Sequence, residues 1–234
     1  TRRANSVAFD VREAGRVERE GDPITGKIVR DENGEAVRVP GTCKSVKGIG
    51  WYIEEYGVAQ ISMNLTNINV TPLHIAFEEV CKSADRRGLR VTGSELVGLV
   101  PLKVMLDTGH YFLKKQQRSG GVSEEEVIKI AVKTLGLDEL TPFDPKKKII
   151  EYQLEGEDST PLLNMNLREF ANETASKSPA PGGGSISAYV GSLGISLATM
   201  VANLSSHKRG WDDRWEEFGE WAERGQQIKD ALLK

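Results

Sequence analysis

The sequence predicts an α+β protein in which a mixed segment of helices and strands is followed by an all-helical segment. In the first part, apolar residues recur at helical spacing in some stretches and at every second position in others. These are the periods of amphipathic helices and of half-buried strands. After a polar stretch at residues 155–161, only the helical period continues. We therefore expect the two parts to differ in architecture.

The first predicted elements are a helix at residues 3–16, a surface hairpin that turns at Asn33-Gly34, and strands at residues 43–54 and 58–65. The two strands meet at a turn at Tyr56-Gly57. In the second strand, the apolar residues Ala59, Ile61, Met63 and Leu65 alternate with the polar residues Gln60, Ser62 and Asn64. This period of two predicts one face on a core and one polar face.

A second helix is predicted from Thr71, as its N-cap, with Pro72 at the first helical position, to Gly88. The remaining elements of this part are a strand at residues 90–100, a helix at residues 101–117, a helix that opens with a capping box at Ser123 and ends near Gly136, and a strand at residues 149–154. The order helix, strand, strand, helix, strand matches a ferredoxin-like sandwich that lacks its first strand.

The predicted domains are residues 1–155, a linker at residues 156–165, and a truncated helical part at residues 166–234. The helical part is expected to hold helices at residues 167–175, 186–205 and 211–234, with a loop at residues 179–185. The chain starts without Met and stops inside a helical pattern. We therefore expect both ends to be cuts through structure, with the first strand upstream of Thr1.

Composition disfavours several classes of partner. A net charge of −3 with scattered Lys and Arg, and an aromatic share of 6%, argue against nucleic acid. No apolar run reaches the roughly 18 residues of a membrane span, and residues 186–204 are expected to form a buried helix, so no membrane partner is expected. Two distant cysteines predict a reduced, cytoplasmic location, and three histidines without close spacing predict no metal site.

Two groups of motifs carry a resemblance to a known family. The first group is Pro40-Gly41-Thr42-Cys43, Val46-Lys47-Gly48-Ile49-Gly50-Trp51-Tyr52, Gln60-Ile61-Ser62-Met63-Asn64-Leu65, Gly93-Ser94-Glu95-Leu96-Val97-Gly98-Leu99-Val100-Pro101-Leu102 and Ile149-Ile150-Glu151-Tyr152. The second is Ser178-Pro179-Ala180-Pro181-Gly182-Gly183-Gly184-Ser185. The first group resembles the C-terminal half of a glutamate formiminotransferase domain. The second resembles the start of a formiminotetrahydrofolate cyclodeaminase domain, and their order is similar to that of the bifunctional formiminotransferase-cyclodeaminase family.

This resemblance implies a folate-dependent enzyme of histidine degradation. The transferase would move a formimino group from N-formiminoglutamate to tetrahydrofolate, and the cyclodeaminase would then release ammonia and form methenyltetrahydrofolate. Polyglutamylated tetrahydrofolate could pass between the two sites. The resemblance places a catalytic His upstream and a catalytic Asp downstream, so no catalytic residue is expected in this chain. The folate contacts of this half would fall on Gly41, Thr42 and Cys43, and the full enzyme would be a homo-oligomer.

Some roles stay open on the residue pattern. The strand residues Gln60, Ser62 and Asn64 could line a folate tunnel with neutral hydrogen-bonding groups, or form a solvated face. The segment Pro181, Gly182, Gly183, Gly184 and Ser185 could offer backbone N–H groups at a helix N-terminus to an anionic folate tail or to a developing charge. The same segment could instead be a flexible joint between domains.

The remaining conspicuous residues favour structural roles. His74, His110 and His207 lack a recognisable partner carboxylate, and Glu95 lies in an apolar stretch where, if buried, it would need a partner. Trp211, Trp215, Phe218 and Trp221 share helical spacing, which favours a core or subunit contact. Two other classes of function remain open: a methenyltetrahydrofolate cyclohydrolase-like enzyme, and a non-catalytic oligomerisation module.

Overall fold

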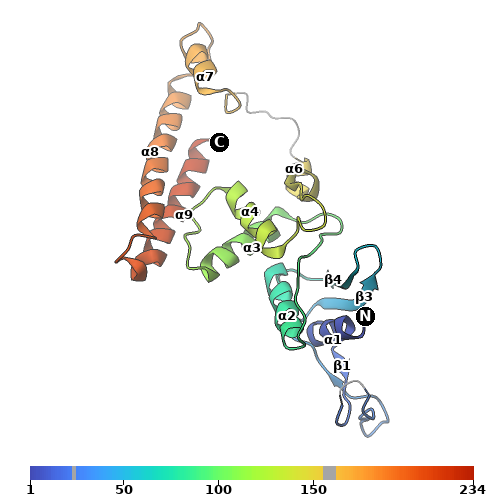
Figure 1. Ribbon diagram of the computed structural model, residues 1–234. Helices are drawn as coiled ribbons and strands as arrows, with labels where there is room; N and C mark the ends of the chain where they lie inside the picture. The colour runs from blue at the N-terminus through green and yellow to red at the C-terminus, as the bar shows by residue number, and fades with distance from the viewer. Residues whose placement is uncertain (23–24, 155–161) are drawn as a thin grey trace. The chain divides into compact units, whose positions relative to one another are not determined.

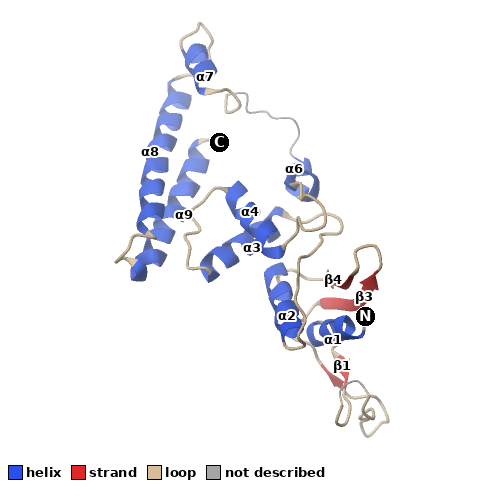
Figure 2. Ribbon diagram, in the orientation of Figure 1, coloured by secondary structure: helices blue, strands red, loops and turns tan. Residues whose placement is uncertain are grey.

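The computed structural model describes residues 1–22, 25–154 and 162–234 (Figure 1). It divides into two compact units, Thr1–Ser94 and Glu95–Lys234. The named strands among the described residues all lie in the first unit, and the described residues after 161 form only helices and connecting segments (Figure 2). The predicted α+β class is therefore confirmed.

The first unit is built around an antiparallel hairpin. Its elements are α1 (Arg2–Val11), β1 (Arg16–Val17), β2 (Arg38–Val39), β3 (Val46–Ile53), β4 (Val58–Leu65) and α2 (Leu73–Asp85). Strands β3 and β4 pair along their whole length, from Val46 opposite Leu65 to Ile53 opposite Val58. Strand β1 pairs with β2 in a separate small sheet. The order helix, strand, strand, helix over α1, β3, β4 and α2 thus agrees with the prediction.

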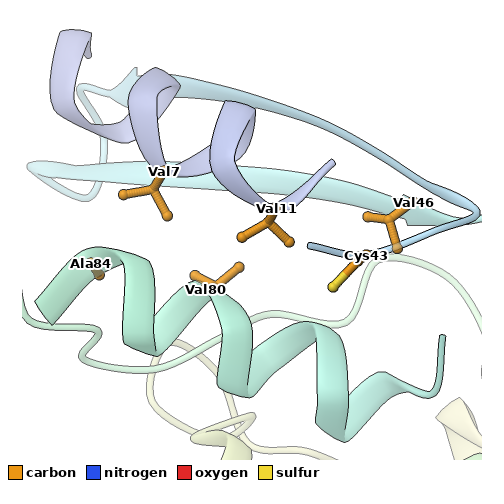
Figure 3. Packing of buried hydrophobic residues seen from close by; sticks show 6 residues of the cluster. All are labelled: Val7, Val11, Cys43, Val46, Val80 and Ala84. Carbon is orange, nitrogen blue, oxygen red and sulfur yellow. The ribbon is translucent and has the colours of Figure 1, made fainter. Parts of the chain in front are cut away.

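The core of this unit lies between α1, α2 and the hairpin. Figure 3 shows Val7 and Val11 of α1 facing Val80 and Ala84 of α2. Cys43 and Val46 complete the cluster, and Ile61, Met63, Leu65, Leu89 and Val91 pack against it while partly buried. The apolar residues of β4 from Ile61 onward therefore face the core, as their alternation predicts.

Helix α1 comes into close backbone contact with β3 at Gly50. A Cβ atom built on Gly50 would lie 2.3 Å from both the carbonyl carbon of Ala4 and the backbone nitrogen of Asn5. The N–H of Gly50 donates to Oδ1 of Asn5 at 3.0 Å. Glycine is required here by the close approach of two backbones rather than by an unusual φ.

The surface hairpin at Asn33-Gly34 is also confirmed. Arg30 bridges to Ala36 in antiparallel fashion, and Gly34 has a φ of 80°. The hairpin is also bonded to the segment that precedes it. The N–H of Glu18 donates to the carbonyl oxygen of Val37 at 2.8 Å, and the N–H of Val29 donates to the carbonyl oxygen of Glu18 at 3.0 Å.

Two predicted details around α2 are wrong. Helix α2 takes Pro72 rather than Thr71 as its N-cap, because Oγ1 of Thr71 donates to the carbonyl oxygen of Lys44 at 2.6 Å. Residues 90–99 form no strand, because they find no neighbouring strand among the described residues. Val97 of this segment is 83% exposed.

The predicted strand at residues 149–154 is a short helix instead. Val100 and Ile149 form one parallel bridge. In it, the N–H of Val100 donates to the carbonyl oxygen of Lys148, and the N–H of Ile150 donates to the carbonyl oxygen of Val100. The pairing stops there because Pro101 is the N-cap of the next helix and has no N–H to donate.

The second unit is helical. Its elements are α3 (Leu102–Lys115), α4 (Glu124–Leu135), α5 (Pro145–Lys148), α6 (Ile150–Leu154), α7 (Leu167–Thr174), α8 (Gly183–Ser205), the 3₁₀ turn η1 (Asp212–Arg214) and α9 (Trp215–Leu232). The predicted helix start at Ser123 is confirmed, since its side chain accepts from the N–H of Glu126. Gly136 ends α4 in the left-handed conformation. Of the predicted linker, residues 156–161 lie outside the described residues, and residues 162–165 form a turn.

Helices α8 and α9 lie side by side (Figure 1). They meet where Gly225 faces Thr199, since a Cβ on Gly225 would lie 2.0 Å from Oγ1 of Thr199. The expectation that residues 186–204 form a buried helix is not met within the described part of the chain. The apolar residues Val190, Leu193, Leu197, Met200, Val201 and Leu204 are all exposed. By length and composition alone, α8 could cross a membrane, a test that core helices of soluble proteins also pass.

The close contact at Gly50 makes a direct prediction about stability. We expect Gly50→Ala to lower the free energy of unfolding of the chain by about 2 kcal/mol or more, because the new methyl group would force α1 away from β3. Gly48→Ala is the matched control, since its Cβ would find its nearest neighbour at an ordinary 3.6 Å. Urea denaturation followed by circular dichroism would measure both. Equal stability of the two variants would contradict the close approach of α1.

Candidate functional site

The candidate residues fall into three regions. The segment Gly41-Thr42-Cys43 and the polar face of β4 belong to the first unit, and the glycine loop before α8 belongs to the second. Each region is described by itself.

The segment Gly41-Thr42-Cys43 is fastened to the end of α1. The N–H groups of Thr42 and Cys43 donate to the carbonyl oxygens of Asp10 and Val11, both at 2.9 Å. A Cβ on Gly41 would lie 2.1 Å from the carbonyl oxygen of Arg12. The segment therefore has the glycine that its packing requires, and two of its N–H groups are already engaged within the protein.

The side chains of this segment point to different environments. Cys43 is only 2% exposed and is part of the core, and this burial raises the pKa of its thiol. Thr42 is exposed, with its Oγ1 3.8 Å from the Cys43 sulfur. Of the three residues predicted to bind folate, only Thr42 offers an exposed side chain. The folate-binding role of the segment remains a prediction.

Thr42 also contacts an ion pair on α2. Lys82 donates to Oε1 of Glu79 at 2.7 Å. This bond, with a second from Thr42, holds the pKa of Glu79 below its usual value. The charge on Glu79 is therefore stabilised beside the predicted folate segment.

The polar face of β4 forms a mixed surface with β3. Gln60 and Ser62 are half-buried and Asn64 is exposed. In the pairing register they lie opposite Trp51, Ile49 and Lys47, respectively. Nε1 of Trp51 donates to Oε1 of Gln60 at 3.1 Å. Because strand side chains alternate, this face lies opposite the one that carries Ile61 and Met63.

This face combines apolar area with uncharged hydrogen-bonding groups. Trp51 is 51% exposed and Ile49 is 58% exposed. An indole beside an amide and a hydroxyl can stack on a planar ring and hydrogen-bond its edge. The pattern of β4 alone predicts only the β4 half of this face. The alternation of β3 together with the hairpin register would have identified Trp51 and Ile49.

The glycine loop lies at the start of α8. Pro181 is buried, Gly182 is the N-cap, and Gly183 and Gly184 lie in the first turn. A Cβ at Gly183 or Gly184 would meet nothing within 4 Å. In the described part of the chain, the N–H groups of Gly183, Gly184 and Ser185 find no acceptor. Three free N–H groups at a helix N-terminus attract an anion or a developing negative charge.

The other conspicuous residues do not gather into a site. His74 lies in the first turn of α2, His110 lies on α3, and His207 follows α8. The described residues contain no group of three His, Cys, Asp or Glu side chains placed to hold a metal ion. Glu95 is exposed, so it does not need the partner that a buried carboxylate would require.

The aromatic residues near α9 form a local cluster. The rings of Trp211 and Phe218 stack with their centroids 5.3 Å apart. Lys208 lies 4.3 Å from the Trp211 ring, and Arg214 lies 4.9 Å from the Phe218 ring. Trp215 is half-buried, whereas Trp221 is 60% exposed.

Comparison with known proteins matches both parts of the chain. A family model described as "Formiminotransferase domain" matches residues 1–155, and a model described as "Formiminotransferase-cyclodeaminase" matches residues 166–234. The formimidoyltransferase-cyclodeaminase of Mus musculus is 46% identical over 184 residues, and that of Gallus gallus is 44% identical over 182 residues. Each match covers 77% of this chain and 34% of the relative.

A shorter match involves a relative with a single named activity. The glutamate formimidoyltransferase of Streptococcus pyogenes serotype M1 is 34% identical over 108 residues, which are 46% of the chain and 33% of that relative. The chain thus spans about a third of the length of the curated relatives it matches. Since the first family model covers more than half of the chain, the protein belongs to the formiminotransferase domain family.

Proposed function

We propose that this chain is part of a folate-dependent enzyme of histidine degradation that joins two activities. The glutamate formimidoyltransferase part transfers a formimino group from N-formiminoglutamate to tetrahydrofolate. The formimidoyltetrahydrofolate cyclodeaminase part releases ammonia and forms methenyltetrahydrofolate. The observation that carries this proposal is the presence of both family segments, in the order transferase and then cyclodeaminase, in one chain.

The outer face of the β3–β4 hairpin is the proposed contact surface for tetrahydrofolate in this part of the enzyme. Trp51 supplies an exposed ring for stacking, and Gln60 and Ser62 supply uncharged hydrogen-bonding groups beside it. Tetrahydrofolate carries planar rings whose edges bear nitrogen donors and acceptors, which this combination suits. Thr42 is the residue of the Gly41–Cys43 segment whose side chain is exposed to a ligand.

The glycine loop before α8 is the proposed ligand loop of the cyclodeaminase part. Its free N–H groups suit the anionic tail of a polyglutamylated folate or a charge that develops during ring closure. The open space around Gly183 and Gly184 leaves room for close approach of a ligand to the backbone.

The assignment of two activities can be tested with a chimera. Residues 1–234 would replace the matching third of the Gallus gallus relative, which is 44% identical to the chain over 182 residues. We expect the chimera to transfer the formimino group and to release ammonia, because the proposed catalytic His and Asp then come from the flanking segments. The chain alone should do neither. Turnover by the pure chain would contradict the placement of the catalytic residues, and a folded but inactive chimera would contradict the proposed function.

The role of the hairpin face can be tested at Trp51. In the chimera, we expect Trp51→Ala to raise the KM for tetrahydrofolate in formimino transfer roughly fivefold or more, because a stacking surface is lost. The matched control is Tyr52→Ala, since Tyr52 is equally exposed, at 50% against 51%, but lies on the other side of β3. Steady-state kinetics would separate KM from kcat. An equal rise in both variants would point to general damage to the hairpin.

The role of the glycine loop can be tested at Gly183. In the chimera, we expect Gly183→Val to reduce ammonia release about tenfold or more while formimino transfer is retained, because a branched side chain blocks approach to the free N–H groups. Gly194→Val is the control, since Gly194 also lies in α8 and also has open space around it. Equal loss of both activities in Gly183→Val would indicate a structural role for the loop.

A further inference from the structure

A cleft of about 270 Å³ opens in the first unit at the junction of α1, β2 and the end of α2. It is lined by Phe9, Asp10, Arg16, Val39, Pro40, Thr42, Arg86 and Arg87. Four of these eight side chains are charged, and three of the four are arginines. The cleft therefore differs from the hairpin face, where Gln60, Ser62 and Asn64 are uncharged and Lys47 is the charged residue paired opposite Asn64.

Asp10 organises the charged side chains of the cleft. Its Oδ1 pairs with Arg16, and its Oδ2 lies 2.6 Å from Nη2 of Arg87. Oγ of Ser83 donates to the same Oδ2 at 2.6 Å. Arg16 is held further by a bond of 3.0 Å from its Nη2 to the carbonyl oxygen of Ser6. Two guanidinium groups are thus fixed around one carboxylate.

The positive charge of this cluster is only partly compensated. The side chains of Arg16 and Arg87 are 18% and 25% exposed, so both are partly buried. Burial and the charge of Arg87 lower the pKa of Arg16, and burial and the charge of Arg86 lower the pKa of Arg87. A buried charge without an equal partner is costly. Because one carboxylate is shared by two guanidinium groups, the cluster keeps a net positive charge, which a bound anion would neutralise.

Arg86 adds a third positive charge at the rim. It is exposed and makes no ion pair with the described residues. The charge of Arg86 helps to lower the pKa of Glu79, but Glu79 is paired with Lys82. Arginine presents a planar fork of N–H donors that matches the oxygens of carboxylates and phosphates. Phe9, Val39 and Pro40 give the cleft an apolar wall beside these donors.

We propose that this cleft is a binding site for a small, multiply charged oxyanion, a polycarboxylate or a phosphate. Arg16 and Arg87, fixed by Asp10, supply preorganised donors inside the cleft, and Arg86 supplies an exposed donor at its rim. Preorganisation lowers the entropy that binding costs. The proposal rests on the cleft and its charge alone, so it stands or falls independently of the folate assignment.

Calorimetric titration of the 234-residue chain with citrate, and separately with inorganic phosphate, tests the site. We expect saturable binding of at least one probe with a stoichiometry of one. Arg86→Gln and Arg87→Gln should each weaken that binding about tenfold or more, because each removes a charged donor. Arg90→Gln is the matched control, since Arg90 is an exposed arginine of the same unit that does not line the cleft.

Each outcome bears on the proposal. Tight binding of citrate alone would identify the ligand class as a polycarboxylate, and tight binding of phosphate alone would identify it as a phosphate. Absence of binding by both probes would overturn the site. Equal weakening in Arg90→Gln and Arg86→Gln would also overturn it, because the attraction would then belong to the overall charge of the surface. Circular dichroism of each variant would show that the fold is retained.

Discussion

Helix α1 lies so close to β3 that glycine is required at position 50, and much of the first unit depends on this contact. The helix directs Val7 and Val11 toward α2 and so closes the core. The carbonyl oxygens at its C-terminal end receive the N–H groups of Thr42 and Cys43 and thereby set where β3 begins. A helix held farther from the strand would leave both the core and this segment without their partners.

The same contact separates two surfaces of different chemistry. Because α1 packs against one face of the β3–β4 hairpin, the other face carries Trp51 and Gln60, with Lys47 as the charged residue near its end. On the helical side, α1 and α2 bring Asp10 and Arg87 together at the cleft. One surface suits planar rings with hydrogen-bonding edges, and the other suits oxyanions.

In the second unit, the contact between α8 and α9 depends on small residues rather than on a large apolar core. Helix α8 is apolar along most of its length and has no charged residue, yet few of its side chains are buried in the described part of the chain. Its contact with α9 at Gly225 shows that small residues set the spacing of the two helices. At its N-terminus, the exposed Gly183 and Gly184 leave the backbone accessible, which is the condition that a ligand loop needs.

Local sequence signals determined much of this protein. The alternation in β4, the glycine turns at Gly34 and Gly57, and the cap at Ser123 act over a few residues, where pattern and backbone preference suffice. The resemblance in the motifs also led to the correct family. A residue pattern, however, does not show whether a pairing strand or a hydrogen-bond partner lies nearby in the fold. Residues 90–99 have a strand-like composition but find no pairing strand among the described residues. Thr71 donates its hydroxyl to the carbonyl oxygen of Lys44 instead of capping α2.

Only the tertiary structure decided which candidate side chains are exposed and which are buried. It placed Cys43 in the core beside an exposed Thr42, and it added Trp51 to the polar face through the register of the hairpin. It also brought Asp10, Arg16 and Arg87 together from the end of one helix, a short strand and the end of another helix. The physical reason is that electrostatic and packing contacts act across space, whereas sequence periodicity reports only which face of each element is apolar.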